Sequence, residues 1–189
     1  MTLLLYDKLP TQNLQQHATI LLVGTHGVGK STLAHALLAE QERANLAIQI
    51  RKVVALPLPT SGSASTRPKI DFVVFMLDMT SKLSLDLLKS AIQQVDIEYL
   101  IGKSCIVATH VDMLHLASIE VDEIDQLLLT YELPFLQINQ LNEQQRAGIA
   151  QRILRQARVA VGRANHMTPA IVAAMERALV TSTLINDDS

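Results

Sequence analysis

Short apolar runs alternate with amphipathic segments along most of the chain. The first run, residues 18–23, reads A-T-I-L-L-V and contains one polar position. A run of four to eight mostly apolar residues is typical of a strand that is buried on both faces, as in a parallel sheet. By this criterion we predict strands at residues 18–23, about 47–56, 70–77, 104–108 and 135–138.

Amphipathic helices are predicted between these strands, because apolar residues recur there every three or four positions. The helical segments are 30–44, 81–95, 121–131 and 142–161, with apolar faces that include Leu33, Leu37 and Leu38 in the first segment and Leu85, Leu88, Ile92 and Val95 in the second. Strands that alternate with helices build an α/β fold. We therefore expect a mostly parallel sheet that is flanked by helices.

A complete phosphate-binding loop connects the first strand to the first helix. Residues 24–31 read G-T-H-G-V-G-K-S, which matches G-x-x-x-x-G-K-[ST] in the required strand-loop-helix context. Its glycines let backbone N–H groups surround an anion at the positive end of the helix. In such a loop Lys30 would reach the β and γ phosphates, and Ser31 would be a ligand of Mg²⁺. The candidate nucleotide-binding residues are Gly24, Thr25, His26, Gly27, Val28, Gly29, Lys30, Ser31 and Thr32. The alternative interpretation is a tight glycine-rich turn that binds nothing.

The parts that hydrolyse a bound nucleotide are missing from the sequence. A GTPase of the small G-protein kind needs a switch threonine on Mg²⁺, an Asp-x-x-Gly motif and a residue that orients the attacking water. No aspartate in the chain has glycine three positions later, and residues 47–69 are too few for two switches plus two strands. The sequence therefore predicts a P-loop fold with shortened or missing switch regions and without efficient hydrolysis.

A weakened guanine-recognition motif follows the strand predicted at 104–108. Residues 109–112 read T-H-V-D, which resembles [NT]-K-x-D with His110 in place of the lysine. Thr109 and Asp112 are therefore added to the candidate nucleotide site, since Asp112 would pair with the guanine N1 and N2 donors. A turn in which Asp112 is a capping residue is the alternative.

A second candidate for nucleotide chemistry is the apolar strand that ends in Asp78. Its form is that of a Walker B strand, whose carboxylate would orient Mg²⁺ in an ATPase or small-molecule kinase. The residues that follow, M-T-S-K, lack the catalytic glutamate of a typical ATPase. We favour a structural interpretation, in which Asp78 ends the fourth strand of a G-protein-like sheet and caps the next turn.

Composition predicts a single domain. The chain has 189 residues, 49% of them hydrophobic, and a formal net charge of −2, so its overall charge gives no argument for nucleic-acid binding. We expect the main body at 1–165 and a C-terminal helix and tail of the same domain at 166–189, where T-P begins a helix at 168–169. Cys105 is expected to be a buried core thiol. The N-terminal residues do not suggest a leader, and no apolar stretch approaches the length of a membrane span.

The helix predicted at 142–161 has a basic face. Between Glu143 and Arg163 there are five arginines and one acidic residue, an excess of +4. The two faces are predicted to carry Ile149, Ile153, Ala157 and Val161 on one side and Arg152, Arg155, Arg158 and Arg163 on the other. This face would suit an acidic partner or phosphate groups, including DNA; a solvated outer face is the alternative.

Several blocks of the sequence resemble the centromere protein M family. They run in the same order and with similar spacing from about residue 7 to residue 160: D-K-L-P at 7–10, A-T-I-L-L-V-G-T at 18–25, L-P-L-P at 56–59, R-P-K-I-D at 67–71, S-K-L-S-L at 81–85, and the segment 95–109. Each block is short and ordinary, whereas their combination is specific. The resemblance implies a small-GTPase-like fold, a pseudo-GTPase, that acts as a structural subunit of the inner kinetochore in the nucleus.

The same resemblance implies partner subunits, and this chain differs from the vertebrate members in its phosphate loop. The expected partners are subunits of the centromere protein I, H and K types, of which the first is stabilised directly, with this chain a monomer inside the hetero-oligomer. The familiar vertebrate members lack G-K-[ST] in the loop, so absence of nucleotide does not carry over to this chain. No cofactor is required by this interpretation, with GTP and Mg²⁺ as optional ligands. A GTP-operated switch or slow GTPase, and a P-loop kinase or ATPase that uses Lys30 and Asp78, stay open as alternatives.

Overall fold

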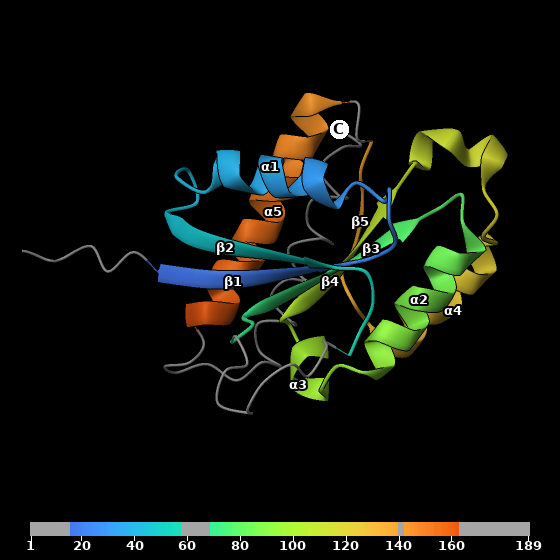
Figure 1. Ribbon diagram of the computed structural model, residues 1–189, viewed down its shortest axis with the longest axis horizontal. Helices are drawn as coiled ribbons and strands as arrows, with labels where there is room; N and C mark the ends of the chain where they lie inside the picture. Colours follow the sequence, from blue (N-terminus) through green and yellow to red (C-terminus); the bar gives the residue numbers. More distant parts are fainter. Residues whose placement is uncertain (1–15, 58–68, 140–141, 163–189) are drawn as a thin grey trace, which may run out of the picture.

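A five-stranded sheet forms the centre of the molecule (Figure 1). The computed structural model describes residues 16–57, 69–139 and 142–162. Its strands lie in the order β2-β1-β3-β4-β5 and are β1 (Gln16–Val23), β2 (Leu46–Val53), β3 (Phe72–Asp78), β4 (Ser104–Thr109) and β5 (Phe135–Gln137). Every neighbouring pair is parallel. The predicted α/β fold with helices around a parallel sheet is confirmed.

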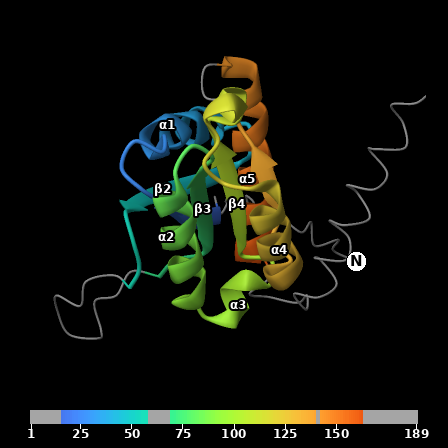
Figure 2. The same cartoon turned by 90° about the vertical axis from the view of Figure 1, so that its right-hand side faces the viewer.

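Helices cover both faces of this sheet (Figure 1). One face packs against α1 (Lys30–Glu40) and α5 (Glu143–Gly162), and the other against α2 (Lys82–Gln93) and α4 (Val121–Tyr131). Strand residues alternate between the two cores, because successive side chains point to opposite faces. Two short helices flank β4, α3 (Ile97–Leu100) before it and the 3₁₀ helix η2 (Val111–Leu116) after it, at opposite ends of the sheet (Figure 2).

Two described connections leave little chain for G-protein switches. Residues 41–45 alone join α1 to β2. Because β1 and β2 are parallel, these five residues lie at the edge of the sheet opposite the phosphate loop, and they cannot reach a ligand bound there. Residues 79–81 alone join β3 to α2. The predicted shortening of the switch regions is thus confirmed at these connections; the loop predicted at 60–68 lies outside the described residues.

Several predicted boundaries were too long. The first helix ends at Glu40 instead of residue 44, in a turn where Asn45 adopts a left-handed φ of 48°. The second strand ends at Val53 instead of residue 56, because it pairs with β1 residue by residue and β1 ends opposite it at Val23. The prediction that Leu38 shares the buried face was wrong. It is 43% exposed, since one helical step of about 100° carries it away from the buried Leu37.

The amphipathic pattern of α5 is confirmed where the helix is described. Ile153 and Ala157 are buried, and Arg152 and Arg155 on the other side are exposed. Arg163 and the helix predicted from residue 168 lie outside the described residues. Cys105 is fully buried in β4, as expected. In the part of the chain that the structure describes, no helix is both long and apolar enough to cross a membrane.

Candidate phosphate-binding site

The phosphate loop begins where β1 ends, and close packing explains its first glycine. The amide of Gly24 donates a hydrogen bond to the carbonyl of Val53, at 3.2 Å. A β-carbon at Gly24 would lie 2.8 Å from the carbonyl oxygen of Met76 on β3. No side chain fits in this space, so glycine lets the loop leave the sheet between β2 and β3.

Two further glycines shape the loop over the start of α1. Gly27 and Gly29 have φ angles of 80° and 92°, a left-handed conformation that glycine adopts without strain. Between them, Val28 is fully buried in the core beneath α1, which anchors the loop. The first N–H groups of a helix have no partner within the helix, so the start of α1 is suited to an anion.

Lys30 folds over the loop. Its Nζ donates hydrogen bonds to the carbonyl oxygens of Gly24 and of Thr25, the latter at 2.6 Å. Burial, and after it the neighbouring Lys52 ammonium, lowers the pKa of Lys30 below its usual value. An anion placed beside this ammonium would oppose both effects.

Lys52 is the residue of this site that the sequence analysis missed. It lies on β2 directly opposite Leu22, whose side chain faces α1, so Lys52 points to the same side. Its Nζ donates a 3.1 Å hydrogen bond to Oγ of Ser31. In the sequence, only the position of Lys52 one residue before the end of β2 points to this role. To recognise it, one has to know the register between β1 and β2.

The remaining candidate residues lie at the loop tip and in the first turn of α1. His26 is exposed at the tip, and Thr25 is half-buried. Thr32 follows Ser31 in the first turn of α1 and lines a pocket between α1 and α5, together with His35 and Arg146 among others. The structure therefore gathers residues 24–32 into one loop and helix start.

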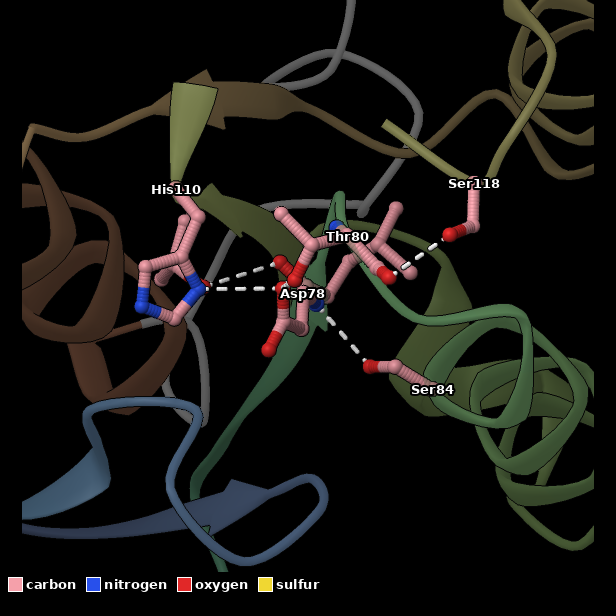
Figure 3. A network of polar contacts seen from close by, with 7 residues as sticks. Asp78, Thr80, Ser84, His110 and Ser118 are labelled. Atoms are coloured by element: carbon pink, nitrogen blue, oxygen red, sulfur yellow. Dashed lines mark hydrogen bonds and ion pairs between the residues drawn. The ribbon is translucent and has the colours of Figure 1, made fainter. Parts of the chain in front are cut away.

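The ends of β3 and β4 form a second polar cluster at the same edge, which we call the β3–β4 corner: Asp78, Thr80, Ser84, His110 and Ser118 (Figure 3). Oδ1 of Asp78 accepts hydrogen bonds from the amide of Thr80 at 2.9 Å and from its hydroxyl at 2.7 Å. The Asp78 amide donates to Ser84 Oγ, and Ser118 Oγ donates to the carbonyl of Thr80. The carboxylate thus shapes the turn into α2, which agrees with the structural interpretation of Asp78.

His110 joins the two strand ends in this corner. It has a left-handed φ of 56°, and its Nδ1 lies 3.0 Å from Oδ1 of Asp78. Burial raises the pKa of Asp78, but the hydrogen bonds from Thr80 and the contact with His110 outweigh it, so that this pKa lies below its usual value. A carboxylate with these donors is held in place by its own neighbours.

The proposed guanine-reading residues lie at the end of β4 and in η2. The hydroxyl of Thr109 is buried and donates to the carbonyl of Leu77 at 3.2 Å. Asp112 is exposed in the first turn of η2. Strand β3 lies between β1, which carries the loop, and β4, which precedes these residues. Guanine recognition stays a prediction.

The loop suits an anion better than a metal ion. Mg²⁺ needs near-octahedral oxygen ligands, normally with carboxylates among them. Here an ammonium contacts the oxygen of Ser31, and among residues 16–57, 69–139 and 142–162 no group of three or more His, Cys, Asp or Glu could hold a metal ion. The residues around Ser31 therefore do not fit a Mg²⁺ site of the usual kind, whereas the loop fits phosphate oxygens. Ser31 as a metal ligand remains a prediction.

A comparison with known families shows to which family the chain belongs. A family profile described as centromere protein M matches residues 1–179 of this chain. The chain belongs to the centromere protein M family. Among curated relatives, the Homo sapiens centromere protein M is 36% identical over 156 residues, which cover 82% of each chain. The Xenopus laevis protein of the same name is 30% identical over 182 residues and 96% of each chain, and the Bos taurus protein is 34% identical over 156 residues and 82% of each chain.

The centromere protein M match spans both clusters of polar residues. Residues 1–179 include the phosphate loop and the β3–β4 corner, so neither belongs to an added domain. The family resemblance seen in the short sequence blocks is thereby confirmed.

Proposed function

We propose that this chain is a non-catalytic structural subunit of the inner kinetochore, with a role in chromosome segregation. The observation that carries the proposal is the β3–β4 corner. There Asp78 accepts two hydrogen bonds from Thr80 in a short turn and contacts His110. Such an arrangement orders the turn from β3 into α2, and this described turn of residues 79–81 is too short to rearrange as a switch does. Membership of the centromere protein M family supports the location at the centromere, hence in the nucleus.

The surface of the described residues supports a role in protein assembly. Val121 and Leu129 on α4 are 68% and 80% exposed. Large apolar side chains that lie open on a helix are suited to a protein partner. By the family resemblance, the partners are subunits of the centromere protein I, H and K types, and the first is the subunit that this chain stabilises.

Co-expression tests this proposal. The full chain is produced with its centromere protein I-type subunit and analysed by size-exclusion chromatography, next to the subunit alone. We expect the two to elute together, and the soluble yield of the subunit to fall when this chain is left out. The Lys30→Ala variant is expected to form the complex as the unchanged chain does, because assembly does not depend on a ligand. Separate elution of the two subunits would contradict the proposal.

We also propose that the phosphate loop retains a ligand as a stabilising group. The left-handed Gly27 and Gly29, together with Lys30, support this second function. A ligand present at a hundred times its Kd would add about 2.7 kcal/mol to the free energy of unfolding. The measurement is a thermal-shift series with GTP and ATP, with Lys30→Ala as the control. If GTP operated a switch, it would also change the affinity for the partner subunit.

A kinase or ATPase that uses Asp78 is less well supported. Two hydrogen bonds from Thr80 already go to its Oδ1, His110 lies beside it, and the turn after it contains no acidic residue. This alternative requires ATP turnover above the background rate, with a preference for ATP over GTP. We expect neither.

A further inference from the structure

We propose that the phosphate loop binds the phosphate groups of its ligand without Mg²⁺, and that Lys52 supplies the positive charge which the metal supplies in other phosphate loops. This inference rests on the proposed retention of a phosphate ligand. It concerns the chemical form of that ligand: a free diphosphate or triphosphate group instead of its magnesium complex.

The position of Lys52 carries the argument. In a magnesium-dependent loop, the serine that follows the lysine gives its hydroxyl oxygen to the metal. Here Oγ of Ser31 accepts a 3.1 Å hydrogen bond from the Lys52 ammonium. A cation therefore already stands next to this oxygen, and it is fixed to the fold through a strand.

Strand β2 fixes the backbone position of Lys52. All eight residues of β2 pair with β1, and Val53, next to Lys52, also accepts the hydrogen bond from Gly24 at the start of the loop. The stem of Lys52 thus starts from the backbone that supports the loop. Its ammonium is exposed, so it can turn from Ser31 to an incoming oxyanion without loss of a buried contact.

Charge balance favours an anion over a metal-bound anion. Two ammonium groups, of Lys30 and Lys52, lie close enough to repel each other. A phosphate group placed between them would attract both, whereas Mg²⁺ would be repelled by each. Among the described residues no carboxylate cluster compensates a divalent cation, and Asp78 is held in the β3–β4 corner.

Isothermal titration calorimetry with pyrophosphate tests the inference, once in excess EDTA and once in excess Mg²⁺. GTP and ATP are titrated under the same two conditions, to distinguish a nucleotide ligand from a free diphosphate. The variants are Lys52→Ala, Lys52→Arg and Lys30→Ala. The matched control is Arg51→Ala, because Arg51 is the exposed cation beside Lys52 on β2, opposite Leu21, and therefore points to the other face of the sheet.

We expect the unchanged chain to bind at least as tightly in EDTA as in Mg²⁺. Lys52→Ala should weaken binding in EDTA by about tenfold to a hundredfold, the usual loss for one charge-assisted hydrogen bond. Lys52→Arg keeps the charge and should recover most of the affinity. Arg51→Ala should bind as the unchanged chain does. Circular dichroism melting curves without ligand check that each variant is folded.

Other outcomes overturn the inference in distinguishable ways. Binding only in Mg²⁺ would leave the phosphate site in place but refute the metal-independent form. Equal affinity of Lys52→Ala and the unchanged chain in EDTA would refute the role of Lys52. No heat with any of the three ligands under either condition would refute the phosphate site itself, and leave the proposed structural role at the kinetochore untouched.

Discussion

The phosphate loop and the β3–β4 corner lie at the same edge of the sheet and are built in opposite ways. In the loop, two lysines concentrate positive charge, and their hydrogen bonds go to the loop itself and to Ser31. In the corner, Oδ1 of Asp78 accepts two hydrogen bonds from Thr80 in the next turn and lies 3.0 Å from Nδ1 of His110, which follows β4. The polar side chains of the loop are cations that hold loop oxygens, whereas that of the corner is an anion that holds a turn.

This difference separates binding from catalysis. A hydrolytic site needs an acceptor that can hold a metal ion or a water molecule beside the phosphates. The acceptor at this edge is used instead to fix the turn into α2 and to join β3 to β4. The chain therefore combines a phosphate-loop sequence with a strand end whose carboxylate fixes a turn, as the proposed structural role requires.

Substitution of Phe75 should disrupt both regions at once. Phe75 is fully buried at the centre of β3, which pairs with the strand that carries the loop on one side and itself ends in the corner. Phe75→Ala is expected to lower the free energy of unfolding by about 3–5 kcal/mol, through lost apolar contacts and the cavity that remains. Urea denaturation followed by circular dichroism measures this. Leu83→Ala on α2, where the side chain is 64% exposed, is the control and should stay within about 0.5 kcal/mol of the unchanged chain.

Gly24→Ala should damage the loop alone. The added β-carbon meets the backbone oxygen of Met76 at 2.8 Å, so the loop or β3 has to shift. We expect a loss of about 2–3 kcal/mol in stability, typical of overpacking, together with loss of phosphate binding. Gly148→Ala on α5 is a control of the opposite sign. Its β-carbon would meet nothing within 4 Å, and alanine in a helix interior should stabilise the chain by about 0.5–1 kcal/mol. A fully stable Gly24→Ala variant would contradict the close packing under the loop.

The fold could be predicted from local patterns because its core strands are apolar on both faces. β3 and β4 read as continuous apolar runs, and the glycine spacing at 24–29 identifies the loop before any contact is known. Helix propensity did not predict where α1 ends. Residues 41–43 are compatible with a helix, but β2 has to start at Leu46 to pair with β1, and this long-range pairing ends the helix.

Residue partnerships across the sheet could not be predicted. Lys52 reaches Ser31 only through the register of β2 against β1, and His110 meets Asp78 only because β4 is the neighbour of β3. Glu40, which reads as an exposed helix residue, is buried and accepts a hydrogen bond from Gln151, 111 positions away. Each of these contacts depends on tertiary order, about which local spacing carries no information.

Asp78→Asn should weaken the corner and leave the loop intact. The amide keeps the shape of the side chain but loses the charge that strengthens three contacts, so we expect a loss of about 1–2 kcal/mol at neutral pH. Because the pKa of Asp78 is lowered in the folded state, its contribution is present above the unfolded value of about 3.9 and is lost as the pH falls through the folded value.

The stability difference between Asp78→Asn and the unchanged chain should therefore shrink as the pH is lowered from 7 to 3. Denaturation curves at several pH values measure it, and pyrophosphate binding at pH 7 should be unchanged. A difference that stays constant with pH would mean that the charge of Asp78 does not stabilise the corner.

Ser31→Ala should have the smallest effect, and it distinguishes this loop from a magnesium-dependent one most directly. Ser31 is exposed, and its hydroxyl has one described contact, from Lys52, so the free energy of unfolding should change by less than about 0.5 kcal/mol. If the Ser31 oxygen holds no metal, pyrophosphate binding in EDTA should change by less than about threefold, since the Lys52 ammonium is then free for the ligand. Calorimetry on Ser31→Ala and Lys30→Ala measures this, and only the second variant should lose binding. A large loss in Ser31→Ala that appears only when Mg²⁺ is present would identify Ser31 as a metal ligand after all. The loop would then share the metal chemistry of other phosphate loops, and its contrast with the corner would lie in catalysis alone.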